Sequence, residues 1–446
     1  MKKSIFGKQA AICGIMAVVF LVGSFTTAWA EKKQTYPLWK SGKTKNKIVV
    51  ISDLHLGVDD TFAETVKNRP YLVKFLQQLQ KTPDVRELVI AGDFLDEWFL
   101  PLNYAPITSQ PEFFQKVITN NQSVLNELQN VMHSGIKLVY VVGNHDMNME
   151  SKVLNKALPG IIQPRDAKGL GRYLTGDRKE IIIEHGHRYD PYSAPDRVSN
   201  KELFGTENIM YPPGYFYARI GTSWVLKNKA QLIHDFPDIS KIPQDGKAYP
   251  VIVHKPAKDN ADQLGAYIYA QLLNGLFHKV TTPDAFDAKI FTLKAGKFTG
   301  HYSQKDMYPV EQADGTISAP VLFRNFQRSW AKRQKQNKVN IPNAFLVAGA
   351  KAGEPGYFYQ CAQEQYLHNP KASYEVVVFG HTHIPDYQKT DSKCYVNTGT
   401  WVDYNLDYPQ ATRTFAVIET GSKDKTTLYV YKENGRLEAW HEKVNQ

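Results

Sequence analysis

The sequence predicts an α/β fold, because patterns typical of buried strands alternate with helical ones. Five short runs rich in β-branched residues have the composition of strands buried on both faces. These runs are residues 47–52, 87–91, 136–142, 179–184 and 374–379. Amphipathic segments separate them, the clearest at 111–133, which is followed by Gly135 as a helix C-cap. Alternation of this kind favours helices packed in layers on sheets.

The alternation changes in two places. The segment 191–371 separates the fourth strand from the fifth and is rich in aromatic residues, Pro and Gly, so we expect a large insertion. After Cys394, three closely spaced runs predict an antiparallel segment with strands at 394–397, 414–419 and 426–432. The predicted organisation is a signal peptide at 1–30, a solvated linker at 31–46, a core in two parts at 47–190 and 372–446, and the insertion at 191–371.

Composition excludes a disordered or fibrous chain. The 446 residues are 42% hydrophobic and 22% charged, which is ordinary for a globular protein of two or three domains or one enlarged domain. Three cysteines are too few for a disulfide scaffold and lack zinc-ribbon spacing. Only the net charge of +10 is unusual.

The first 30 residues have the pattern of a secretory signal peptide. Lys2, Lys3 and Lys8 precede an apolar run at 10–23, and the small-x-small sequence ending at Ala30 predicts cleavage there. An uncleaved anchor is the alternative, but the run is shorter than the roughly 20 residues that span a bilayer. We therefore expect export to the periplasm or the extracellular space. A disulfide between the two remaining cysteines, Cys361 and Cys394, is left open.

The basic excess belongs to the insertion. Removing the three leader lysines leaves +7, which equals the surplus of 22 Lys and Arg over 15 Asp and Glu within 191–371. A predicted helix at 320–338 places Leu322, Phe326 and Trp330 on one face. Its opposite face carries Arg324, Arg328, Lys332 and Lys335. That face is either a solvated surface or a binding surface for phosphate groups or an anionic membrane. The aromatic stretch 211–224 is either core packing or the wall of a pocket.

Polar residues able to bind metals follow each of the five strands. The blocks are Asp53-Leu54-His55, Gly92-Asp93, Gly143-Asn144-His145-Asp146, His185-Gly186-His187 and Gly380-His381-Thr382-His383. Ligand sites in open α/β sheets lie beyond the carboxyl ends of the strands, so we expect the five loops to converge on one edge. Each block alone could be a turn or a surface loop, but five in one order make that reading improbable.

The types of ligand indicate the metals. Imidazole, carboxylate and one amide oxygen, without thiolate, suit divalent Mn, Fe, Zn or similar ions. The blocks offer more ligands than one tetrahedral zinc site uses. Two ions bridged by a carboxylate would use them all and would favour phosphoryl transfer.

The five blocks closely resemble those of the calcineurin-like metallophosphoesterases. The resemblance covers roughly residues 47–190 and 372–446 and includes the CYVNTGTW sequence after the last block. It implies a four-layer α/β-β-α sandwich with a dinuclear site at the sheet edge and a lid-like insertion between the fourth and fifth blocks.

The resemblance also implies a role for each residue. Asp53, His55 and His383 would hold one ion, Asn144, His185 and His381 the other, and Asp93 would bridge them. A hydroxide between the ions would attack phosphorus. His145 would act as general acid or stabilise the leaving oxygen, and Asp146 would orient His145. His187 would stand outside the ligand set, and Asp96 would support the Gly92-Asp93 loop.

The implied function is a secreted phosphoesterase acting on phosphodiester, pyrophosphate or phosphomonoester bonds of small nucleotide, sugar or lipid-headgroup substrates. Glu97-Trp98 stands where the family's protein phosphatases have Arg-Gly, which disfavours phosphoprotein substrates. The sequences of the first two blocks most resemble those of the UDP-2,3-diacylglucosamine pyrophosphatases, whose members lack a secretory signal. A nuclease is one alternative, disfavoured by the modest charge and the lack of an Arg-dense stacking groove. A non-enzymatic, metal-stabilised surface binding protein is the other.

Overall fold

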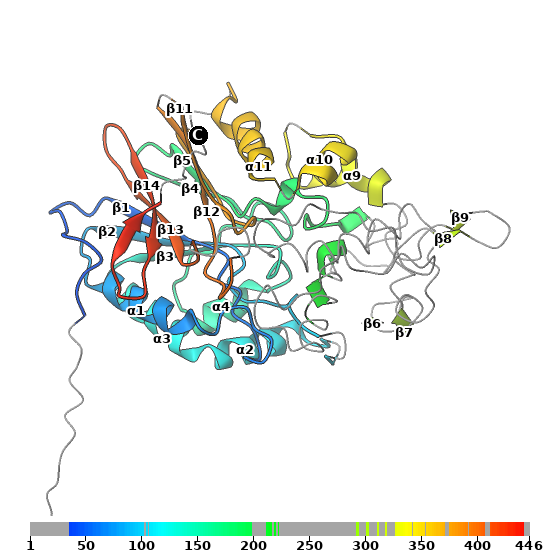
Figure 1. Cartoon of the computed structure of the whole chain (residues 1–446), viewed down its shortest axis with the longest axis horizontal. Coiled ribbons are helices and arrows are strands. Elements are labelled where there is room, and N and C mark those ends of the chain that lie inside the picture. The colour runs from blue at the N-terminus through cyan, green and yellow to red at the C-terminus, as the bar shows by residue number, and fades with distance from the viewer. Residues whose placement is uncertain are drawn as a thin grey trace, which may run out of the picture. The chain divides into compact units, whose positions relative to one another are not determined.

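The computed structural model describes residues 35–101, 104–105, 107–198, 211–215, 218–219, 222, 291–293, 300–302, 310–311, 317–318, 326–340, 342–352, 354–370, 374–390, 392–405 and 411–440. The chain divides into two compact units, Met1–Thr35 and Tyr36–Gln446, and every element below belongs to the second. Figure 1 shows these elements and labels most of them. The predicted signal peptide lies outside the described residues.

The first sheet has six strands in the order β15-β14-β13-β1-β2-β3. Its members are β1 (Lys47–Ile51), β2 (Val85–Ala91), β3 (Lys137–Val141), β13 (Thr414–Glu419), β14 (Lys425–Tyr431) and β15 (Leu437–Ala439). β1, β2 and β3 are parallel, whereas β13 joins β1 antiparallel and begins an antiparallel edge.

The second sheet has five strands in the order β11-β12-β10-β5-β4. Its members are β4 (Tyr173–Thr175), β5 (Ile181–Ile183), β10 (Val376–Phe379), β11 (Pro385–Thr390) and β12 (Lys393–Thr398). β5, β10 and β12 are parallel, and both edge strands are antiparallel. The class is therefore α/β with two mixed sheets.

Three hydrophobic clusters separate the layers. Alternate strand residues of both sheets, such as Val50 and Val378, form one cluster between the sheets. The other face of the first sheet packs on α1 (Arg69–Gln80), α2 (Gln110–Asn120), α3 (Gln122–His133) and α4 (Ser151–Ala157). The other face of the second packs on α9 (Phe326–Gln336), α10 (Phe345–Lys351), α11 (Pro355–Ala362) and the helical turn η6 (Gln363–Leu367). The two groups of helices lie on opposite sides of the sheets in Figure 1.

A few short elements complete the described fold. The 3-10 turn η1 (His187–Tyr189) follows β5. Two short hairpins, β6 (Phe291–Leu293) with β7 (Gly300–Tyr302) and β8 (Val310–Glu311) with β9 (Ile317–Ser318), lie within the predicted insertion. None of the helices in the described part of the chain is long and apolar enough to cross a membrane.

All five predicted core strands are present, but two expectations about the elements were wrong and some strands were not predicted. The predicted helix at 111–133 is two helices, because the buried Asn121 amide donates to the carbonyls of Val117 and Gly57 and marks the break. The segment after Cys394 is not one antiparallel unit, since β12 pairs parallel with β10 and β13 crosses to the first sheet. The strands β4 and β11 have no strong sequence pattern and were not predicted.

The described residues 36–46 of the predicted linker are mostly exposed, but a few of them are anchored to the core. The Leu38 side chain is buried, and its amide donates to the Thr82 hydroxyl at 3.0 Å. The Trp39 indole and the Gly42 amide both donate to the Asp84 carboxylate, at 2.9 and 3.0 Å. The polar composition hid this segment's anchors, which are one leucine and one tryptophan.

The two cysteines form no disulfide. Cys361 packs in the cluster between the second sheet and its helices, whereas Cys394 packs between the two sheets. Because they lie in clusters on opposite faces of one sheet, they behave as small buried apolar residues.

Candidate metal centre and active site

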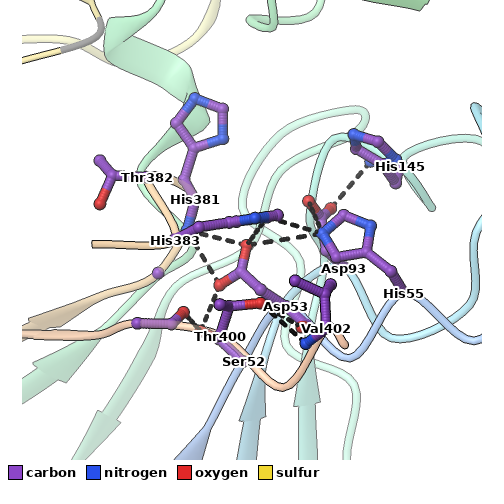
Figure 2. Close-up of polar contacts among 12 residues, drawn as sticks. Ser52, Asp53, His55, Asp93, His145, His381, Thr382, His383, Thr400 and Val402 are labelled. Carbon is purple, nitrogen blue, oxygen red and sulfur yellow. Dashed lines mark hydrogen bonds and ion pairs between the residues drawn. The ribbon is translucent and has the colours of Figure 1, made fainter. Parts of the chain in front are cut away.

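The five polar blocks converge, but from both sheets rather than from one. β1, β2 and β3 of the first sheet and β5 and β10 of the second all end at this point. The six acidic and imidazole ligands implied by the resemblance come together in overlapping groups, together with His145. These groups are Asp53 with His55 and His383, His55 with Asp93 and His145, and Asp93 with His185 and His381. Figure 2 shows the Asp53 carboxylate between the rings of His55 and His383.

Five of these side chains are carried by backbone in the left-handed region. Asp53, His55, Asp93, His381 and His383 have φ values of 51°, 39°, 51°, 75° and 60°. Residues with a Cβ rarely adopt such angles, and strain of this kind persists only where the surroundings enforce it. The turns after β1, β2 and β10 are thus held in strained conformations that aim the ligands inward.

The first half of the site consists of Asp53, His55 and His383. The Nε2 atoms of His55 and His383 are 2.9 Å apart, and an Asp53 oxygen is 3.4 Å from His383 Nε2. His55 Nδ1 donates to Asp96 at 2.6 Å, so in the neutral ring Nε2 keeps its lone pair. Asp53 also accepts from the His381 amide at 3.1 Å and from the Ser52 hydroxyl.

The second half consists of Asn144, His185 and His381. His185 Nε2 and His381 Nδ1 lie 2.9 and 3.0 Å from the same Asn144 oxygen. His185 Nδ1 donates to the Ala91 carbonyl at 2.8 Å, and His381 Nε2 donates to Asp190 at 3.1 Å. Each neutral ring therefore directs a lone pair at an oxygen that also only accepts, and a cation between them would satisfy both. Asp190 was not predicted as a residue of the site, because no sequence pattern links it to a histidine 191 positions away.

Asp93 lies between the two halves. One carboxylate oxygen is 3.1 Å from His185 Nε2 and 3.6 Å from His55 Nε2, and the other accepts from the His145 amide at 2.8 Å. Burial alone would raise the pKa of Asp93, but positive charge on protonated His185, His145 and His55 holds it well below the usual range, and cations bound by the neutral rings would have the same effect. The same opposition between burial and the histidines lowers the pKa of Asp53. Both carboxylates are therefore ionised.

The donor set fits two divalent ions. It combines buried imidazole nitrogens, ionised carboxylates and one amide oxygen, with lone pairs facing one another at about 3 Å. Asp53, His55 and His383 would hold one ion, Asn144, His185 and His381 the other, and Asp93 would touch both.

His145 lies beside this centre and is held on two sides. Its ring stacks on Trp98 at 4.4 Å between centroids and 28° between planes, and its Nδ1 donates to Asp96 at 2.7 Å. The other Asp96 oxygen accepts from the amides of Trp98 and Phe99, which is the loop support expected of it. The negative charge of Asp96 is maintained, because His145 and His55 lower its pKa against the effect of burial.

The contacts of Asp146 differ from the orienting contact expected of it. Its oxygens accept from the amides of Phe94 and Gly143, both at 2.7 Å, so it joins two loops of the site. The contact that orients the His145 ring comes from Asp96 instead, because the turn after β2 brings that carboxylate under the ring. His187 is buried beside the ligands and outside the three groups, with its Nε2 donating to the Gly169 carbonyl at 3.0 Å.

The predicted basic surface lies on α9, away from these contacts. Arg328, Lys332 and Lys335 are exposed while Trp330 is buried, which confirms an amphipathic helix over the described residues. Arg324 lies outside the described residues. Among the residues the structure describes, no contact joins this surface to the metal centre, and the hypothesis of a membrane surface gains no support. Arg333, on the same helix, was not among the predicted residues. Its side chain is buried, and its Nε atom lies 3.5 Å from a carboxylate oxygen of Asp196.

A family comparison agrees with the site. The model of the calcineurin-like phosphoesterases matches residues 46–214, which carry the first four blocks and five of the seven implied ligands. This match assigns residues 46–214 to the calcineurin-like phosphoesterases, and the buried His/Asp groups give them the site of a metal-dependent phosphoesterase. The fold supplies His381 and His383 from beyond the matched residues.

Solved structures were compared as well, and the chain is similar to several of them. Vacuolar protein sorting 29 from Cryptosporidium parvum is 11% identical, with 89% of this chain and 95% of that chain covered and a TM-score of 0.29. A dimetal phosphatase from Danio rerio is 11% identical, with 86% and 95% covered and a TM-score of 0.34. A phosphopantetheinyl hydrolase from Mycobacterium tuberculosis is 12% identical, with 79% and 89% covered and a TM-score of 0.24. At these scores the assignment rests on the family match and the site. Among curated proteins, none matches the chain.

Proposed function

We propose that the protein hydrolyses phosphodiester, pyrophosphate or phosphomonoester bonds of small substrates with two divalent ions. The observation that carries the proposal is the place of Asp93, with one oxygen between His55 Nε2 at 3.6 Å and His185 Nε2 at 3.1 Å. A carboxylate shared by two sets of ligands is the arrangement of a two-metal phosphoesterase. When bound, the ions supply Lewis acidity and lower the pKa of water.

The chain's own residues then supply the proton and the enclosure. His145 Nδ1 is occupied by Asp96, so Nε2 is the ring nitrogen that delivers a proton to the leaving oxygen. Asp96 stabilises the positive charge of that imidazole and fixes its orientation. The rings of Trp98 and Phe99, with centroids 4.4 and 4.8 Å from that of His145, exclude water from one side of it.

The choice of small substrates follows from the loop after β2. Trp98 is buried under His145 and belongs to the Glu97-Trp98 pair that stands where the family's protein phosphatases have Arg-Gly. A nuclease is the second candidate within the same chemistry, and nucleic-acid affinity that falls steeply with salt would favour it.

The test is hydrolysis of bis-p-nitrophenyl phosphate and p-nitrophenyl phosphate by the full chain. Activity should disappear with a chelator and return with Mn²⁺, Fe²⁺ or Zn²⁺. The His145→Asn variant should retain its metal and lose about a hundredfold in kcat, the usual contribution of a general acid. His133→Asn, at an exposed position, is the matched control. Undiminished turnover after chelation would contradict the proposal.

We also propose that the protein is exported and cleaved after Ala30, because the leader has the basic start, apolar run and small-x-small end of a signal peptide. Sequencing the amino terminus of protein recovered from cells that express the full chain should give Glu31 first. A chain that keeps Met1 would contradict export by cleavage.

A further inference from the structure

Asp190 connects a metal-binding histidine to the first residues of the predicted insertion. Its carboxylate accepts from Nε2 of His381 at 3.1 Å and from the Tyr192 amide at 2.8 Å. Its carbonyl accepts from the Ala194 amide at 2.7 Å. We call residues 190–197 the support loop. Because both the side chain and the backbone of Asp190 are bonded within this loop, the position of the carboxylate depends on where the support loop lies.

A buried arginine of the insertion helix α9 holds the support loop. One guanidinium nitrogen, Nη2 of Arg333, donates to the carbonyls of Pro191 and Ala194 at 2.8 and 2.7 Å. The Nε atom of Arg333 lies 3.5 Å from a carboxylate oxygen of Asp196, and both side chains are fully buried. One side chain of α9 therefore contacts the support loop at three residues.

Three further hydrogen bonds join the end of α9 to the same part of the chain. The Asn337 side-chain amide donates to the Pro195 carbonyl at 3.1 Å, and Arg197 donates to the Gln336 carbonyl at 3.2 Å. Arg188, just before the support loop, donates to the Asn337 carbonyl at 2.7 Å. Since each segment both donates to the other and accepts from it, the helix and the loop are held together as one packed unit.

The charge of Arg333 also acts on the support loop. Burial lowers the pKa of Arg333, and the negative charges of Asp196 and Asp190 oppose that shift. Arginine stays charged in proteins, so this buried cation attracts both carboxylates of the loop. Replacing it with an apolar side chain would leave two buried carbonyls without this donor and the loop without this charge, which is unfavourable for the present position of the loop.

We propose that Arg333 is a positioning residue of the metal centre, which holds the support loop so that Asp190 keeps the His381 ring oriented for one ion. A carboxylate behind a ligating histidine fixes the tautomer and the direction of its ring. The inference rests on the two-ion site of the proposed function and goes beyond it, because the affinity of one ion then depends on a helix of the insertion. The other ion, which Asp53 would bind, should be independent of Arg333.

The experiment is a titration of the chelator-treated full chain with Mn²⁺, in which bound ions are counted and two dissociation constants are fitted. Arg333→Met removes the donors and keeps a side chain of comparable length. It should raise the dissociation constant of one ion about tenfold, the lower end of the usual effect of a group behind a ligand, and change the other by less than about twofold. Arg328→Met, at an exposed position of the same helix, is the matched control and should change neither.

A double variant separates positioning from a general loss of structure. Asp190→Asn should weaken the same ion. Adding Arg333→Met to it should change that dissociation constant by less than about twofold more, because both residues act on His381 along one path and their effects do not add. Arg333→Lys, which keeps the charge, should bind this ion with an affinity between those of Arg333→Met and the parent. Asn337→Ala removes only the contact with Pro195, should cause a smaller loss at the same ion, and gives the reading if Arg333→Met does not fold.

Three results would overturn the inference while leaving the proposed function intact. In the first, Arg333→Met, or Asn337→Ala in its place, binds both ions like the parent. In the second, both ions are weakened equally. In the third, the losses caused by Asp190→Asn and Arg333→Met multiply in the double variant. A parent chain that binds fewer than two ions, or that has no metal-dependent hydrolysis, would instead contradict the proposed function itself.

Discussion

The two halves of the metal centre are supported differently. Asp53, His55 and His383 are held within the core, where Asp96 accepts from His55 and Asn405 donates to the His383 carbonyl at 2.9 Å. In the other half, His381 donates to Asp190, the last residue before the predicted insertion.

That second support continues into the insertion. Arg333 of α9 donates to the carbonyl of Pro191, the residue next to Asp190, at 2.8 Å. One ion site is thus fixed by strand ends and loops of the core alone, and the other also depends on how the insertion docks. Changes in the insertion can therefore alter metal binding through Asp190.

The largest effect is expected where the two halves meet. Asp93→Asn removes the charge shared by both ion sites, so activity should fall by about 10³-fold or more and the bound metal should drop. Turnover and metal content per chain are the measurements. Glu433→Gln, which alters an exposed carboxylate, should change neither.

Asp96→Asn tests the half supported within the core. Because one carboxylate oxygen holds both His55 and His145, the variant should lose about 10²-fold in kcat even at saturating metal. Full restoration of kcat by added metal would show that Asp96 supports only the ligand.

Asp190→Asn tests the other half. The loss should be about 10–100-fold in affinity for one ion, which is typical for a carboxylate behind a ligating histidine, and added metal should restore kcat. If the Asp96 and Asp190 variants had the same kcat at saturating metal, the two halves would not differ in the way proposed.

A smaller effect is expected in how the folding stability depends on pH. Burial raises the pKa of Glu97 to about 8 from an ordinary value of 4.5. The folded chain keeps this proton between those pH values while the unfolded chain loses it, so stability falls as pH rises through this window. The Glu97→Gln variant cannot ionise and should therefore gain stability relative to the parent from pH 5 to pH 8. Urea unfolding midpoints measure this, and a constant difference across that range would be contrary to it.

The smallest effect is expected on α9. Changing Arg328, Lys332 and Lys335 together to Gln should alter the metal content and the hydrolysis of bis-p-nitrophenyl phosphate by less than about twofold, since surface charges are screened. A large loss of activity or of bound metal would show that this surface affects the metal centre, as the contact of Arg333 with Pro191 allows α9 to do.

The sequence predicts the ligands better than their supports. Asp53, His55 and Asp93 belong to short blocks directly after buried strands, and such local patterns can be read without a structure. The partners Asp96 and Asp190 meet histidines that lie far along the chain, so only the fold shows these pairs. The sequence also could not predict that the strands of the site belong to two sheets, because the pattern of a strand indicates its burial and not which strand lies beside it. Leu38 and Trp39 show the same limit, since two apolar anchors in a polar segment leave no periodic signal.

The most direct test of the two-metal claim is a titration of the chelator-treated full chain with Mn²⁺, following bound ions and bis-p-nitrophenyl phosphate hydrolysis together. Activity should return fully only as the bound metal reaches two ions per chain. Full activity with one ion per chain, or with none, would contradict the account.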